Sequence, residues 1–145
     1  MTEDILENIP EGSIYTTRTI IISTFFGGLL AGGYMVYWNF KTFGEHKKAI
    51  TALVLTILTL LAVMATGFFP ALDRIPAIFY TIFITLGVSL LTKRYQGSLI
   101  DKHISNNGKI YSTGRAVLVC VISIIVIAAF LMGAYLLQDA AAGRL

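Results

Sequence analysis

The chain has 145 residues, of which 56% are hydrophobic and only 13% are charged, with a formal net charge of +3. Soluble domains carry about 25% charged residues, so this composition excludes an ordinary water-soluble fold. The small positive charge does not indicate nucleic-acid binding, because the basic residues are confined to short segments between long apolar runs.

The charged residues are segregated along the chain. Four windows without any charged side chain cover residues 19–40, 49–70, 75–92 and 116–138. Each window is close to the roughly 20 residues that a helix needs to cross a bilayer. The sequence therefore predicts an all-α fold, a four-helix transmembrane bundle of two helical hairpins, forming one membrane domain over residues 19–138.

The segment 1–18, "MTEDILENIPEGSIYTTR", is acidic. A signal peptide opens with basic residues and closes at small ones, so we expect the first window to be retained as a membrane helix. The segment 139–145 is expected to be a short tail.

Glycines interrupt the first window in the stretch "FFGGLLAGGYMVYWNF". In lipid there is no hydrophobic driving force for helix association, so membrane helices associate through small residues that let their backbones approach closely. We expect the first and fourth helices to pack antiparallel through small residues, namely Gly27, Gly28, Ala31, Gly32, Ala129 and Gly133. The alternative is that the glycines break the helix and expose its backbone to a substrate, as in transporters with discontinuous helices.

Hydroxyl side chains gather on one face of the second window and one face of the third. The residues are Thr56, Thr59, Thr66, Thr81, Thr85 and Ser89. They either bond to carbonyls of their own or neighbouring helices, or line a polar pore formed by several chains. No carboxylate, lysine, arginine or histidine lies within the four windows, which argues against ion-coupled transport.

The loops 41–48 and 93–115 carry eight of the eleven basic residues. The positive-inside rule therefore places both loops in the cytoplasm and both termini on the other side. We expect four cations beside the spans to contact anionic lipid head groups: Lys47, Lys48, Lys93 and Arg94. Pro70 and Asp73 predict a tight outer turn between the second and third helices. In "YQGSLIDKHISNNGK", Leu99, Ile100 and Ile104 predict a short interfacial helix followed by a turn.

The residues that carry most enzyme chemistry are sparse. His46 and His103 lie in the basic loops near carboxylates, a setting that needs no special role, and Cys120 has no partner for a disulfide. Neither a nucleophile motif, a phosphate loop nor a set of metal ligands is present in the sequence. We therefore expect no catalytic residues, no metal and no cofactor.

The stretches "FFGGLLAGGYMVYWNFKTFGEHKKA" and "QGSLIDKHISNNGKIYSTGRA" resemble a group of uncharacterised small bacterial four-helix membrane proteins. That group has a motif of two glycines, proline, leucine, alanine, two glycines and tyrosine, followed by asparagine, phenylalanine and lysine. Asn39 and Lys41 match its second part, and Leu29 replaces the proline. The resemblance implies a bacterial inner membrane and implies no activity.

These patterns favour a non-catalytic integral membrane protein that acts through helix–helix association, by self-assembly or as an accessory subunit of a membrane complex. The alternative is an oligomeric pore or membrane-perturbing effector lined by the hydroxyl faces. The expected partners are the anionic lipid bilayer and a second copy or another membrane protein, and not nucleic acid.

Overall fold

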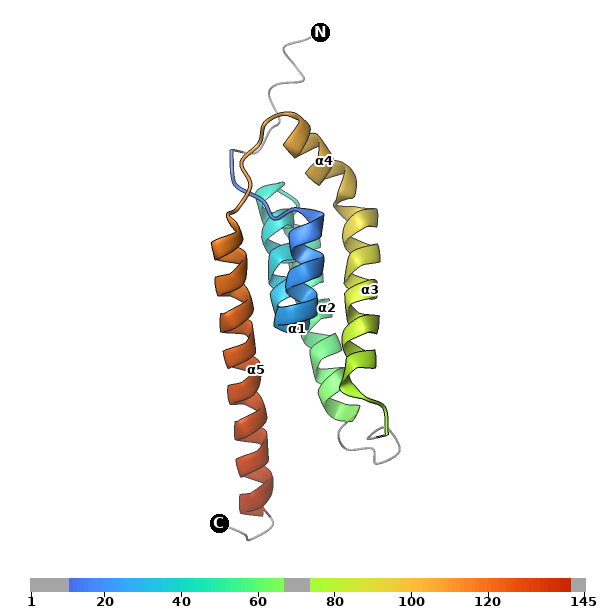
Figure 1. Ribbon diagram of the computed structural model, residues 1–145, viewed down its shortest axis with the longest axis vertical. Helices are drawn as coiled ribbons and strands as arrows, with labels where there is room; N and C mark the ends of the chain where they lie inside the picture. Colours follow the sequence, from blue (N-terminus) through green and yellow to red (C-terminus); the bar gives the residue numbers. More distant parts are fainter. Residues whose placement is uncertain (1–10, 67–73, 142–145) are drawn as a thin grey trace.

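The chain folds almost entirely into helices. The computed structural model describes residues 11–66 and 74–141, with five helices: α1 (Thr17–Thr42), α2 (His46–Ala65), α3 (Ala77–Tyr95), α4 (Gly97–Ser105) and α5 (Thr113–Ala141) (Figure 1). By length and composition, α1, α2, α3 and α5 could each cross a membrane. The all-helical class and the multi-pass membrane character predicted from the sequence are thus confirmed. Residues 1–10 and 142–145, and the expected turn at Pro70 and Asp73, lie outside the described residues.

The first long helix folds back on itself. The side chain of Asn39 forms hydrogen bonds with both the backbone N–H and the carbonyl of Tyr15, at 2.8 and 2.7 Å. A straight helix would hold positions this far apart in sequence about 36 Å from each other. The reversal occurs at Gly28, whose φ of 75° and ψ of −176° are not helical. α1 is therefore a helical hairpin with a first arm (17–27) and a second arm (29–42), rather than the single span expected over 19–40 (Figure 1).

Small side chains allow this reversal. A φ of 75° with an extended ψ is a conformation that is essentially restricted to glycine, which explains Gly28. Immediately beyond the turn the two arms touch, because a Cβ added at Gly32 would overlap the Thr24 hydroxyl. Thr24 in turn donates a hydrogen bond of 2.7 Å to the Ile20 carbonyl, which keeps its hydroxyl satisfied inside the hairpin.

The fold-back changes the expected topology. Residues 11–16 lie beside the loop that follows α4, where Ile14 donates to the Lys109 carbonyl at 3.1 Å and accepts from the Tyr111 N–H at 2.9 Å. These residues and both basic loops are thus at one end of the molecule, whereas α5 ends at the opposite end (Figure 1). We expected both termini to lie opposite the basic loops. The described N-terminal segment departs from that expectation because α1 returns to the end at which it starts.

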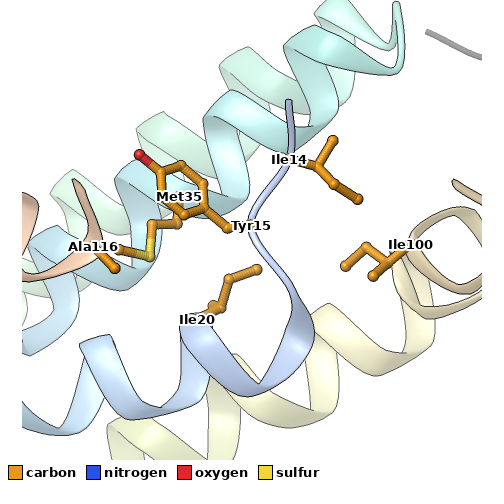
Figure 2. Close-up of a cluster of buried hydrophobic side chains, with 6 residues drawn as sticks. All are labelled: Ile14, Tyr15, Ile20, Met35, Ile100 and Ala116. Atoms are coloured by element: carbon orange, nitrogen blue, oxygen red, sulfur yellow. The ribbon is translucent and has the colours of Figure 1, made fainter. Parts of the chain in front are cut away.

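α1 is the central element of the packing. It contacts α2, α3 and α5, whereas α4 packs on α3 and adds Ile100 to the buried cluster that includes Ile14. The tightly buried apolar side chains cluster at the basic end: Ile14, Tyr15, Ile20, Met35, Ile100 and Ala116 (Figure 2). Most other large apolar side chains on α2, α3 and α5 are exposed, as suits helices whose solvent is lipid.

Candidate functional site

The glycines of α1 face several different neighbours. A Cβ on Gly27 would lie 2.8 Å from Cys120 Cα in α5, and a Cβ on Gly28 would lie 3.6 Å from the Ile127 side chain. Gly33, which is not one of the residues expected to pack, lies directly against Thr56 of α2. The small residues therefore serve three contacts: arm to arm, α1 to α5 and α1 to α2.

The α5 residues expected to meet these glycines lie elsewhere. Ala129 is exposed, and a Cβ on Gly133 would have no neighbour within 4 Å among the described residues. The contacts that do form between the first arm and α5 advance in the same direction along both segments. The Cys120 thiol lies 3.8 Å from the Ser23 carbonyl, and Ile127 lies beside Gly28 further along both segments. The first arm and α5 consequently run parallel rather than antiparallel. The physical reason is the fold-back. Because α1 returns to the end at which it starts, the first arm begins at the same end of the molecule as α5 and runs in the same direction.

The predicted pore-lining hydroxyls mostly bond within their own helices. Thr56, Thr59, Thr66 and Thr81 donate to the carbonyls of Ala52, Leu55, Val63 and Ala77, respectively. Ser89 is half-buried, and the buried hydroxyl of Thr85 has no hydrogen-bond partner among residues 11–66 and 74–141. The arrangement matches the simpler of the two sequence-based interpretations, in which the hydroxyls satisfy helix carbonyls.

A large cleft lies between α2 and α3, which make few contacts with each other, and its floor is the second arm of α1. We call it the α2–α3 cleft. It has a volume of about 720 Å³, within the range of about 300–1,000 Å³ typical of small-molecule pockets. Its walls are mostly apolar, and its polar lining comes from seven side chains: Lys48, Thr51, Thr56, Thr59, Thr92, Tyr95 and Gln96. Sequence reasoning did not identify this cleft, because it depends on how far apart two helices stand.

A buried amide pair holds the basic end of the hairpin. Asn39 and Gln96 are both fully buried, and the Asn39 amide approaches Gln96 Oε1 at 3.5 Å. Gln96 Nε2 donates to the Val36 carbonyl at 2.8 Å, so α3 is tied to the second arm. Buried amides are retained where all of their partners are present, and here they join the N-terminal segment, α1 and α3. A lone asparagine within an apolar window is the sequence signal that could have identified this contact.

Aromatic rings and an arginine form a second cluster at the same end. The Arg115 guanidinium lies 4.0 Å from the centre of the Tyr111 ring and donates to the Tyr15 hydroxyl at 3.2 Å. Trp38 Nε1 donates to the Tyr111 hydroxyl at 2.7 Å. Burial raises the pKa of the Tyr15 phenol, and the hydrogen bond from Arg115 partly opposes that rise. The cluster fastens the start of α5 to the N-terminal segment.

The cations expected at lipid head groups are all exposed near that end: Lys47, Lys48, Lys93 and Arg94. Lys48 pairs with Glu45 at 2.9 Å, but both side chains are solvated, so this ion pair contributes about 0–1 kcal/mol. His46 is exposed, whereas His103 is buried and its Nε2 lies 3.1 Å from the Lys109 carbonyl.

The tip of the α1 hairpin is open. Phe25 and Phe26, just before the turn, are 40% and 70% exposed. The first arm is about 17 Å long, roughly half of a hydrocarbon core about 30 Å thick. Beyond Ser123, α5 has no buried residue in its described part, although the Ile127 side chain lies beside Gly28.

Residues 11–66 and 74–141 contain no group of three or more histidine, cysteine or carboxylate side chains that could hold a metal ion. The arrangement is therefore best described as a membrane-embedded hairpin beside an apolar cleft. Comparison of the chain with protein-family models, with curated proteins and with solved structures finds no match.

Proposed function

We propose that this chain is a non-catalytic integral membrane protein that acts by helix–helix association, with a second copy of itself or a partner subunit covering the tip of the α1 hairpin. The observation that carries the proposal is the reversal at Gly28, which is only half-buried. A chain reversal leaves helix-end N–H and carbonyl groups without intrahelical partners. In the hydrocarbon region such groups are tolerated only when buried in protein or facing a water-filled cavity.

The surroundings of the tip support a protein partner over lipid. Phe25 and Phe26 are large aromatic side chains, and aromatic residues are enriched at protein–protein contacts. The second half of α5, which has no buried residue in its described part, extends beyond the hairpin (Figure 1). A helix from a second chain at that position would contact both the tip and α5.

The orientation follows from the positive-inside rule applied to the observed fold. The loops 41–48 and 93–115 would face the cytoplasm together with residues 11–16, and α5 would end on the other side. The localisation we propose is a bacterial inner membrane, with the basic end toward anionic head groups. This orientation leaves the hairpin entering the bilayer from the cytoplasmic face.

Photo-cross-linking tests the association. A photoreactive phenylalanine analogue replaces Phe26 at the tip or, as a matched control, Phe83 on α3, which is equally exposed at 71%. In native membranes we expect a product with the mass of two chains, or of this chain with one defined membrane protein, from position 26 and not from position 83. Adducts with lipid alone at position 26 would contradict the proposal.

An oligomeric pore or membrane-perturbing effector is the second candidate. One observation favours it, since Thr51, Thr56, Thr59 and Thr92 line the same cleft. A hydroxyl that donates to its own helix keeps lone pairs that can accept from water or coordinate a cation. Flux through liposomes that is abolished by Thr59→Val, in a variant that still folds, would favour the pore. Unchanged flux, or none in the parent protein, would exclude it.

A further inference from the structure

We propose that the α2–α3 cleft binds an acyl chain of an anionic phospholipid, with the head group at the end of the cleft near Lys48. The site reaches the hairpin tip only at Leu29, does not include Phe25 or Phe26, and does not rest on the proposed association. A monomer that retains lipid would support this inference and contradict the proposed function.

The polarity of the cleft is graded along its length. Its deeper part is lined mostly by apolar side chains such as Leu29, Leu55 and Phe83, and the hydroxyls of Thr56 and Thr59 there donate to carbonyls of their own helix. Lys48 and Thr51 lie in the early turns of α2, and Gln96 follows the last turn of α3, so these polar groups share the basic end of the molecule. An occupant must therefore be an elongated amphiphile with its polar end at the basic loops. A phospholipid of the leaflet at that end has this shape.

Charge at the mouth selects the head group. Lys48 lines the cleft, and its pair with Glu45 is solvated and easily exchanged for another anion. Lys47 precedes Lys48 on the same helix, and Lys93 and Arg94 are exposed at the end of α3. This group of cations favours a net-negative head group over a zwitterionic one.

Native mass spectrometry of the purified chain, mixed with equal amounts of phosphatidylglycerol and phosphatidylcholine of the same chains, tests the inference. Gly87 lines the cleft and a Cβ there would meet no atom within 4 Å, so Gly87→Leu fills the space without a backbone clash. Gly133→Leu is the matched control, because Gly133 is equally open but lies on α5. We expect Gly87→Leu to reduce bound phosphatidylglycerol at least fivefold and Gly133→Leu to leave it unchanged.

A charge variant tests the head group separately. Lys48→Gln should reduce the preference for phosphatidylglycerol over phosphatidylcholine by about fivefold, whereas Lys102→Gln on α4 should not. Lys48 is exposed, so the Lys48→Gln measurement remains informative even if Gly87→Leu fails to fold. Equal retention of the two lipids by the parent chain, or lipid retention that neither Gly87→Leu nor Lys48→Gln alters, would overturn the proposal. A dimer that excludes lipid from the cleft would also overturn it.

Discussion

The Asn39 side chain holds the backbone of Tyr15 through two hydrogen bonds, although the two residues are 24 positions apart in the chain. This contact joins the start of the first arm of α1 to the end of the second arm. It therefore defines α1 as a hairpin, because a continuous helix would keep these residues at opposite ends.

Removing this clamp should destabilise the fold. In Asn39→Leu the N–H and carbonyl of Tyr15 remain buried without partners, at about 1–3 kcal/mol for each group. We expect a lower free energy of unfolding and a lower melting temperature in detergent. Gln138→Leu, which removes an exposed amide from α5, should have little effect. Equal stability of the two variants would mean that the hairpin does not depend on Asn39.

Gly28 should be required for its backbone conformation rather than for space. A Cβ at this position would have only the Ile127 side chain within 4 Å, at 3.6 Å, yet its φ of 75° with an extended ψ is strained for any other residue. Gly28→Ala should therefore cost about 1–3 kcal/mol. Gly133→Ala, in a helical and open position, should be neutral or stabilise by up to about 1 kcal/mol. Thermal unfolding of the two variants compares the effects, and a neutral Gly28→Ala would argue against the reversal.

The contact between α1 and α2 gives a prediction at Gly33. A Cβ at Gly33 would lie 2.8 Å from Thr56 Cβ and overlap the rest of that side chain. Gly33→Leu should consequently destabilise by at least about 1–3 kcal/mol, the usual range for overpacking. Gly87→Leu, whose Cβ points into open space, should be tolerated. If Gly33→Leu unfolds at the parent temperature, α1 and α2 do not pack as described.

Cysteine labelling in intact cells tests the topology. In a Cys120→Ala background, cysteines at Ser13 and Asn107 should react alike with an impermeant thiol reagent, because both positions are at the end with the basic loops. A cysteine at Gln138 should have the opposite accessibility. With the proposed orientation, an impermeant thiol reagent should label only position 138. Labelling of position 13 together with position 138 would restore the topology expected from four complete spans.

Several features follow from the sequence alone. The charge-free windows predict long membrane helices because the desolvation of a charge in hydrocarbon excludes it from any helix of this kind. The apolar residues of "YQGSLIDKHI" predict a short helix, and α4 occupies Gly97–Ser105. The i−4 hydrogen bonds of Thr56 and Thr59 are likewise a local property of threonine in a helix.

Tertiary structure alone decided how the first window is used. An uncharged stretch is equally compatible with lipid whether it crosses the bilayer or reverses within it, so hydropathy cannot distinguish the two. The four glycines at 27, 28, 32 and 33 permit both close packing and a turn. Only the φ of Gly28 and the pairing of Asn39 with Tyr15 select the turn. The reversal then places the N-terminal segment beside Ile110, aligns the first arm parallel to α5 and leaves the α2–α3 cleft open. Each of these features depends on contacts between residues far apart in sequence, so local sequence patterns do not reveal them.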